Sequence, residues 1–143
     1  MSRKSWLLAA LAVAEEQWVT PVQLQKALFL LGKKRPSEVG TDFYVFAPYH
    51  YGPFCLDIYN DINDMIKIGL VETQRAVRGN WKEYRATAEG RKEAATIRAA
   101  LPAEAVSYLA RLISWAASLS FSDLVRKIYA AFPEYRENSI FFG

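Results

Sequence analysis

The side chains best suited to covalent chemistry are those of His50 and Cys55, the single histidine and the single cysteine of this 143-residue chain. We expect Cys55 in the first turn of a helix that opens at residues 51–53, where a thiol can acquire a lowered pKa and an imidazole can act as its base. Cys55 also lies beside Phe54 and Ile58 on the apolar face of that helix, and an unpaired cysteine is often a small core residue. We therefore predict that the chain is not an enzyme and has no catalytic residue.

Metal and cofactor chemistry lack the residues they need. One cysteine and one histidine cannot complete a zinc site, and one cysteine cannot form an internal disulfide. The sequence has neither a glycine-rich phosphate loop nor a serine nucleophile elbow. It therefore predicts no metal and no cofactor, and its cysteine content is typical of a cytoplasmic protein.

Three aspartates recur at helical spacing in the same segment. Asp57, Asp61 and Asp64 stand at i, i+4 and i+7, which places them opposite the expected apolar face. Such a stripe is most often an ordinary solvated face, but it also suits the docking of a basic partner protein, because complementary charge steers association. One helix face cannot surround a cation, so a metal is the least favoured interpretation.

Basic residues collect in two other places, around an expected β-hairpin and after the second helix. A hairpin tip with Arg78 and Lys82 can contact phosphates or a minor groove. Because Glu72 and Glu83 alternate with these bases, a plain solvated ribbon is also consistent with the pattern. The candidate nucleic-acid-binding residues are Arg75, Arg78, Lys82, Arg85, Lys33, Lys34 and Arg35.

The elements that must position these groups follow from apolar periodicity and capping signals. The run Trp6–Ala14 imitates a signal peptide, but it is short for one and too short to span a bilayer, so we expect a helix with one buried face. A second helix begins at a capping box in residues 20–23 and ends at Gly32, with Lys26 and Lys33 pointing outward.

Further elements follow in an order typical of a winged helix-turn-helix. We expect a strand over residues 42–47, a helix over 51–68, hairpin strands over 70–77 and 81–86, and a helix from Thr87 to about Leu101. Two amphipathic helices follow Pro102 and Ser120. The predicted fold is a mostly α single domain with a small β-hairpin, comprising a winged-helix-like core over residues 1–100 and a helical extension over 101–143.

The apolar tail Ile140-Phe141-Phe142-Gly143 needs a partner surface. We expect it to pack on this domain or on a second copy in a homodimer, because burying two phenylalanines stabilises a small domain substantially. Phe141 and Phe142 are otherwise candidates for recognition by a partner protein.

Two stretches follow each other in a distinctive order. Leu24-Gln25-Lys26-Ala27-Leu28 belongs to a helix, and Tyr51-Gly52-Pro53-Phe54 leads into Asp57-Ile58-Tyr59. This order resembles the Panacea domain, the shared antitoxin domain of many bacterial and phage toxin–antitoxin systems. The resemblance covers residues 20–70; Phe132-Pro133-Glu134-Tyr135 stands at the place of the family's closing motif but lacks its Thr-His and Pro-Trp elements.

The resemblance implies a non-catalytic antitoxin-type or regulatory protein that docks a partner, such as a toxin. The alternative is a transcriptional regulator that binds double-stranded DNA through the basic hairpin. Neither interpretation involves a membrane.

Overall fold

Two apolar helices form the centre of the fold. In the computed structural model, which describes residues 2–77 and 79–141, these are α1 (Arg3–Val13) and α2 (Pro21–Lys34). Every residue from Trp6 to Ala12 and from Leu24 to Leu31 is buried. A helix that is apolar on all sides needs neighbours on all sides. The expectation of a single buried face on the first helix was therefore wrong.

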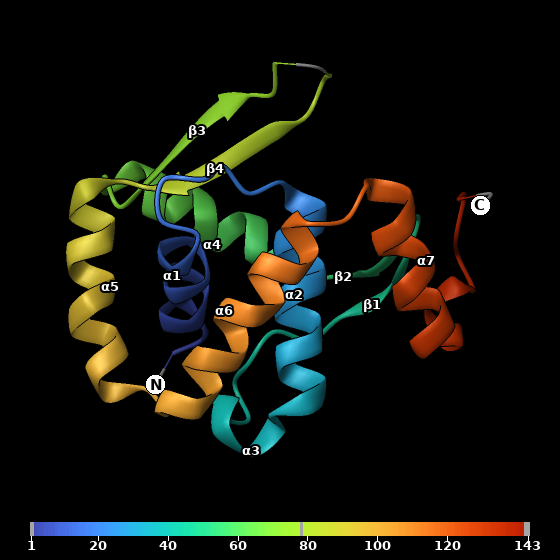
Figure 1. Cartoon of the computed structure of the whole chain (residues 1–143), viewed down its shortest axis with the longest axis horizontal. Helices are drawn as coiled ribbons and strands as arrows, with labels where there is room; N and C mark the ends of the chain where they lie inside the picture. Colours follow the sequence, from blue (N-terminus) through green and yellow to red (C-terminus); the bar gives the residue numbers. More distant parts are fainter. Residues whose placement is uncertain (1, 78, 142–143) are drawn as a thin grey trace.

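The remaining helices pack around this pair (Figure 1). α5 (Ala88–Ala100) and α6 (Ala103–Ala117) contact α1, and α6 also contacts α2. α4 (Leu56–Lys67) contacts α1 from the hairpin side, and α7 (Phe121–Ala131) contacts α2. Two short helical turns complete the set, α3 (Pro36–Val39) and the 3₁₀ helix η1 (Pro133–Arg136).

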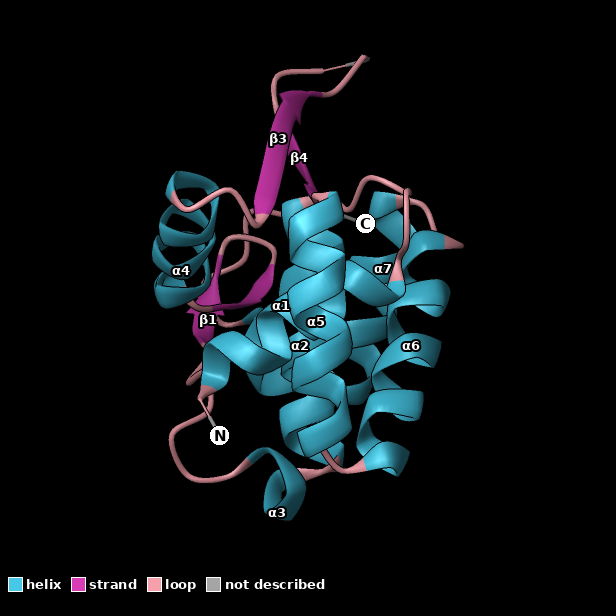
Figure 2. Ribbon diagram, turned by 90° about the vertical axis from the view of Figure 1, so that its left-hand side faces the viewer, coloured by secondary structure: helices cyan, strands magenta, loops and turns pink. Residues whose placement is uncertain are grey.

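Two antiparallel hairpins replace the single hairpin expected. β1 (Ala47–Tyr49) pairs with β2 (Gly52–Phe54), and β3 (Val71–Arg75) pairs with β4 (Lys82–Ala86). The β3–β4 hairpin projects from the helical body (Figure 2). Its base is held by Val19, which exchanges two backbone hydrogen bonds of 2.8 and 2.9 Å with Tyr84.

Several predicted helix starts are confirmed by their caps. The Thr20 side chain and the Gln23 side chain form the predicted capping box of α2. Thr87 accepts a hydrogen bond from the Gly90 amide at the start of α5, and Ser120 accepts one from Asp123 at the start of α7. These local hydrogen bonds satisfy amides that the helix itself leaves free, which is why the sequence signal was reliable.

Three local predictions were wrong. Residues 43–46 form no strand, because Phe43 and Tyr44 bury their rings in the core and the strand begins at Ala47. Gly32 does not end α2; it lies within the helix, where a Cβ atom would come within 2.9 Å of the Phe43 ring. Residues 52–54 form β2, so the predicted helix begins only at Leu56, with Cys55 as its N-cap residue.

The fold is mostly helical with small β-hairpins, as predicted. The more specific assignment of a winged-helix core stays a prediction. Among the described residues, no helix has the length and hydropathy to cross a bilayer.

Candidate functional site

The two stretches that carry the family resemblance meet in space. The Gln25 side chain, buried in α2, donates a hydrogen bond from Nε2 to the Cys55 carbonyl (3.0 Å) and accepts one from the Cys55 amide at Oε1 (2.9 Å). The Gln25 side chain thus makes the two hydrogen bonds to the Cys55 backbone, between β2 and α4, that a neighbouring strand would otherwise make. This pair of bonds fixes the β1–β2 hairpin against α2.

Lys26 was predicted to point outward, and it is buried, with 3% of its surface exposed. Its ammonium donates a 3.1 Å hydrogen bond to the Pro53 carbonyl. The hairpin passes over the lysine at Gly52, whose φ of 104° favours glycine and whose Cβ position lies 3.6 Å from Lys26 Cε. Loss of hydration lowers the pKa of Lys26 to about 8.

This lysine lines the smaller of two neighbouring cavities. We call the larger one, with a volume of about 490 Å³, the aromatic groove, and the smaller one, of about 190 Å³, the lysine cavity. They share four lining residues, Pro21, Val22, Tyr51 and Tyr59. The groove is completed by Thr20, Gln23, Trp81, Leu119, Phe121 and Leu124, and the lysine cavity by Gln25, Lys26, Tyr49, Gly52 and Phe54.

The rim of the aromatic groove carries exposed rings from three different parts of the chain. Trp81 comes from the residue before β4, Phe121 from the start of α7, and Tyr51 from the β1–β2 turn, with exposed fractions of 47%, 43% and 39%. The Tyr51 and Phe121 rings meet edge to face at 5.0 Å between centroids. Deeper in the groove, burial raises the pKa of Tyr59 to about 12.

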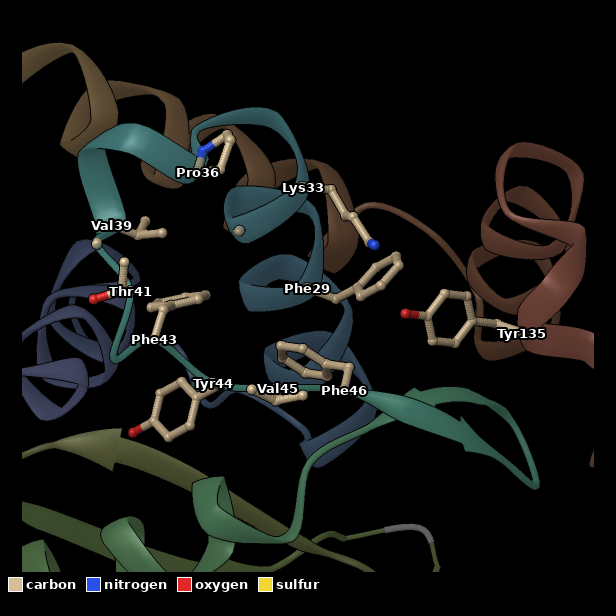
Figure 3. Close-up of a pocket in the computed structure, with 12 residues that line it drawn as sticks. Phe29, Lys33, Pro36, Val39, Thr41, Phe43, Tyr44, Val45, Phe46 and Tyr135 are labelled. Carbon is tan, nitrogen blue, oxygen red and sulfur yellow. The ribbon is translucent and has the colours of Figure 1, made fainter.

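A second aromatic cleft, of about 350 Å³, lies near the other end of α2 (Figure 3). Phe29, Phe43 and Tyr135 contribute rings to it. Its lysine, Lys33, lies 5.7 Å from the Phe29 ring centroid and 5.9 Å from that of Tyr135. These π faces already stabilise the Lys33 ammonium, so an anionic ligand gains less from its charge here than from that of Lys26 in the lysine cavity.

The acidic stripe of α4 is paired within the chain. Arg3 contacts Asp57 at 3.1 Å and Asp61 at 2.9 Å, and Lys4 contacts Asp64 at 3.2 Å. Asp57 and Asp64 are exposed, but Asp61 is buried, which corrects its placement opposite the apolar face. The stripe lies against the start of α1, so much of its charge is neutralised before any partner arrives.

The candidate nucleic-acid-binding residues are split between two ends of the molecule. The β3–β4 hairpin lies at one end, and the α2–α3 corner with Lys33, Lys34 and Arg35 lies at the other (Figures 1 and 2). Arg35 pairs with Glu38 at 3.1 Å.

On the hairpin, Arg85 pairs with Glu72 at 2.8 Å and lies over the Trp18 ring, 4.2 Å from its centroid. Arg75 contacts the Asn80 side chain, and Lys82 is exposed. Arg78 lies outside the described residues.

The apolar tail packs on its own domain through Phe141. The Phe141 ring lies 6.1 Å from Phe121 and 6.3 Å from Tyr129, measured between centroids. The Ile140 amide donates to the His50 carbonyl at 3.0 Å, although half of the Ile140 surface stays exposed. Phe142 lies outside the described residues.

His50 and Cys55 do not form a nucleophile and base. The His50 ring stacks on Tyr49, with 4.1 Å between centroids, and Cys55 is buried. Burial raises the pKa of the Cys55 thiol, which is the opposite of what a reactive thiolate requires. Within residues 2–77 and 79–141, no three histidine, cysteine, aspartate or glutamate side chains gather to hold a metal.

Sequence reasoning missed the lysine cavity because Lys26 was interpreted as a solvent-facing residue. A usable signal was present: residues 24–31 are apolar on every side of the helix except at Gln25 and Lys26. Polar residues inside a helix that is buried all round must have partners in the interior.

No protein-family model matches this chain, and no curated protein matches it.

Proposed function

We propose that the chain is a non-catalytic binding protein of antitoxin or regulatory type, of bacterial or phage origin, which acts in the cytoplasm by docking a partner protein. The observation that carries the proposal is the aromatic groove with Trp81, Phe121 and Tyr51 on its rim. Aromatic side chains are enriched at protein interfaces and supply much of their binding energy, and grouped exposed rings mark such surfaces.

The partner that fits this groove presents an apolar segment. The described residues that line the groove are uncharged, so an apolar segment loses no favourable charge contact on entering it. The acidic stripe of α4 supports docking less well than the groove does, because Arg3 and Lys4 already occupy its carboxylates. The resemblance to the Panacea domain adds support, since its two motifs form the walls of the neighbouring lysine cavity.

A growth assay tests this proposal. Each reading frame next to the gene is expressed alone and together with the chain, and an antitoxin restores growth in the presence of one toxic neighbour. The double variant Trp81→Ala and Phe121→Ala should lose this protection, while Val77→Ala, which removes a 95% exposed side chain outside the groove, should keep it. Full protection by the double variant, or no neutralised neighbour, contradicts the proposal.

A double-stranded DNA-binding regulator is the second candidate function. The Val19–Tyr84 pairing supports it, because in a winged helix a short extended segment pairs with a strand of the projecting hairpin, as Val19 does here. The exposed face of α4 weighs against it, since the helix expected in the major groove would turn Asp57 and Asp64 toward phosphates, even though Arg3 and Lys4 neutralise part of their charge. Binding of a labelled random DNA duplex is measured at low salt, about 50 mM, where phosphate contacts are strong. This measurement decides between the DNA-binding function and the docking of a partner protein.

If DNA is the ligand, Lys82→Ala should lower the salt slope of binding by about one unit, which corresponds to one lost phosphate contact. Glu83→Ala serves as the matched control on the same strand. Absence of binding by the unaltered chain at low salt eliminates this function.

A further inference from the structure

Lys26 is the one charged side chain among the described residues that line the aromatic groove and the lysine cavity. Its ammonium has three hydrogen-bond donors, and the Pro53 carbonyl accepts from it. Within the described parts of the chain, none of the ion pairs includes Lys26. A buried cation without a counter-ion is costly, so this cavity favours the entry of a negative group.

The backbone adds to the positive potential. Pro21 and Val22, which line both cavities, form the first turn of α2, and the N-terminal end of a helix carries a partial positive charge. The other polar groups around the lysine are the Gln25 amide, which is occupied by Cys55, and tyrosine hydroxyls. The described lining residues include no carboxylate that would repel an anion.

The dimensions suit a small ligand with two unlike ends. The aromatic groove, at about 490 Å³, falls in the usual range for small-molecule sites, which are mostly apolar with a few polar groups. The lysine cavity is too small for a folded segment, and Lys26 is almost fully covered, so a compact charged group suits it better than a peptide strand. One cation offsets one negative charge, which favours a monoanion over a phosphate dianion.

We propose that the aromatic groove and the lysine cavity together form a binding site for a small amphipathic carboxylate. The carboxylate lies beside the Lys26 ammonium, and the apolar body lies against Tyr51, Tyr59 and Trp81. This ligand would occupy the same groove as the apolar segment of a partner protein, so the two compete for it. The two proposals are tested separately, the carboxylate by the probes below and the partner by the growth assay.

Calorimetry with a matched pair of probes tests the proposal. The probes are 4-phenylbutanoate and its uncharged amide, 4-phenylbutanamide, titrated into the full chain at neutral pH. We expect the carboxylate to bind roughly ten to a hundred times more tightly than the amide, the range that a charge-assisted hydrogen bond supplies. Equal affinities, or no heat from either probe at millimolar concentration, overturn the site.

Two variants assign the preference to the lysine. Lys26→Met keeps the apolar stem and removes the charge, so the affinity ratio of the two probes should fall to about one. Lys92→Met removes an exposed lysine of α5, which lies in neither cavity, and should leave the ratio unchanged. Circular dichroism establishes that both variants are folded.

A pH series on the unaltered chain gives a second test. The carboxylate binds the protonated lysine, so its affinity should stay constant up to the pKa of Lys26, about 8, and fall by as much as about tenfold per pH unit above it. The titratable groups around Lys26 are Tyr49, Tyr51 and Tyr59 in the cavity, Tyr129 across Gly52, and His50 on the turn.

The amide probe corrects for changes of the groove that affect both probes alike. A charge change on a neighbouring group acts mainly on the carboxylate, so the same series on Lys26→Met is the control, and there the ratio should stay constant. In the unaltered chain the ratio of the two affinities should fall above pH 8. A ratio that stays constant between pH 7 and 9.5 contradicts the pairing with Lys26, and it leaves the growth assay for a protein partner unaffected.

Discussion

Tyr44 and Asp61 meet in the core, where the tyrosine hydroxyl donates a 2.7 Å hydrogen bond to Oδ2 of the aspartate. Arg3 donates to the same oxygen from Nε at 2.9 Å, and its guanidinium lies 5.2 Å from the centroid of the Tyr44 ring. These three side chains join α1, the segment before β1, and α4. The buried Asp61 carboxylate, which accepts from both side chains, therefore links these three parts of the fold.

Asp61→Ala should lower the free energy of unfolding by about 3 kcal/mol, because it leaves the buried Tyr44 hydroxyl without its acceptor and Arg3 with Asp57 alone. Asp64→Ala removes an exposed ion pair with Lys4 and should cost less than about 1 kcal/mol. Urea denaturation followed by circular dichroism measures both values. Equal losses for the two variants would show that the buried network contributes no more to stability than the exposed ion pair does.

Gln25→Ala should destabilise the chain by about 2 kcal/mol and release the β1–β2 hairpin, since the Cys55 amide and carbonyl lose their partner together. The matched control is Gln23→Ala, which removes one half of a capping box and should cost about 1 kcal/mol. Hydrogen exchange gives the local readout. The Cys55 amide should exchange faster in the first variant and at the original rate in the second.

The lowered pKa of Lys26 makes the free energy of unfolding depend on pH in the alkaline range. The unfolded chain keeps this proton up to the ordinary lysine pKa, whereas the folded chain releases it near pH 8. The unfolded state thus binds more protons above pH 8, so stability should rise with pH by up to about 3 kcal/mol before pH 10.

Lys26→Met should abolish this rise, and the exposed Lys34→Met should retain it. Denaturation at pH 7.5 and 9.5 provides the comparison. The comparison stops at pH 9.5 because burial raises the pKa of Tyr59 to about 12. A phenol with a raised pKa in the fold gives a contribution of opposite sign, which is lost as the pH rises above the ordinary tyrosine value. A rise in the Lys26→Met variant equal to that of the unaltered chain would exclude Lys26 as its source.

Gly90→Ala should be destabilising although alanine is the better helix former. In an open helix position the exchange gains about 1 kcal/mol, but here the new Cβ would overlap the carbonyl oxygen of Leu70. The backbone must shift, and we expect a net loss of about 2 kcal/mol. Ala95→Gly, at an exposed site of the same helix, calibrates the propensity term. A stabilised Gly90→Ala chain would contradict the close approach of α5 to Leu70.

The sequence predicted those features that depend on neighbours along the chain. Thr20, Thr87 and Ser120 were identified as caps because a cap is a contact over three residues. The β3–β4 hairpin followed from its glycine-containing turn and flanking strands. In each case the decisive hydrogen bonds are local.

Features that depend on distant partners were not predicted. Lys26 and Asp61 have polar side chains, and their burial follows from the Pro53 carbonyl in one case and from Arg3 and Tyr44 in the other. Gly32 was interpreted as a helix end, because the Phe43 ring that requires it is not visible in the local pattern. The groove combines four separate segments, so no single stretch could have revealed it.

The position of α1 at the centre has a consequence for biosynthesis. The buried residues Trp6–Ala12 are translated before the helices α5 and α6 that cover them. A ribosome-bound chain therefore exposes an apolar helix until α5 and α6 have emerged to cover it. Contacts of such long range slow folding and expose the nascent chain to aggregation, so we expect the yield of native protein to depend on chaperones that hold apolar nascent helices.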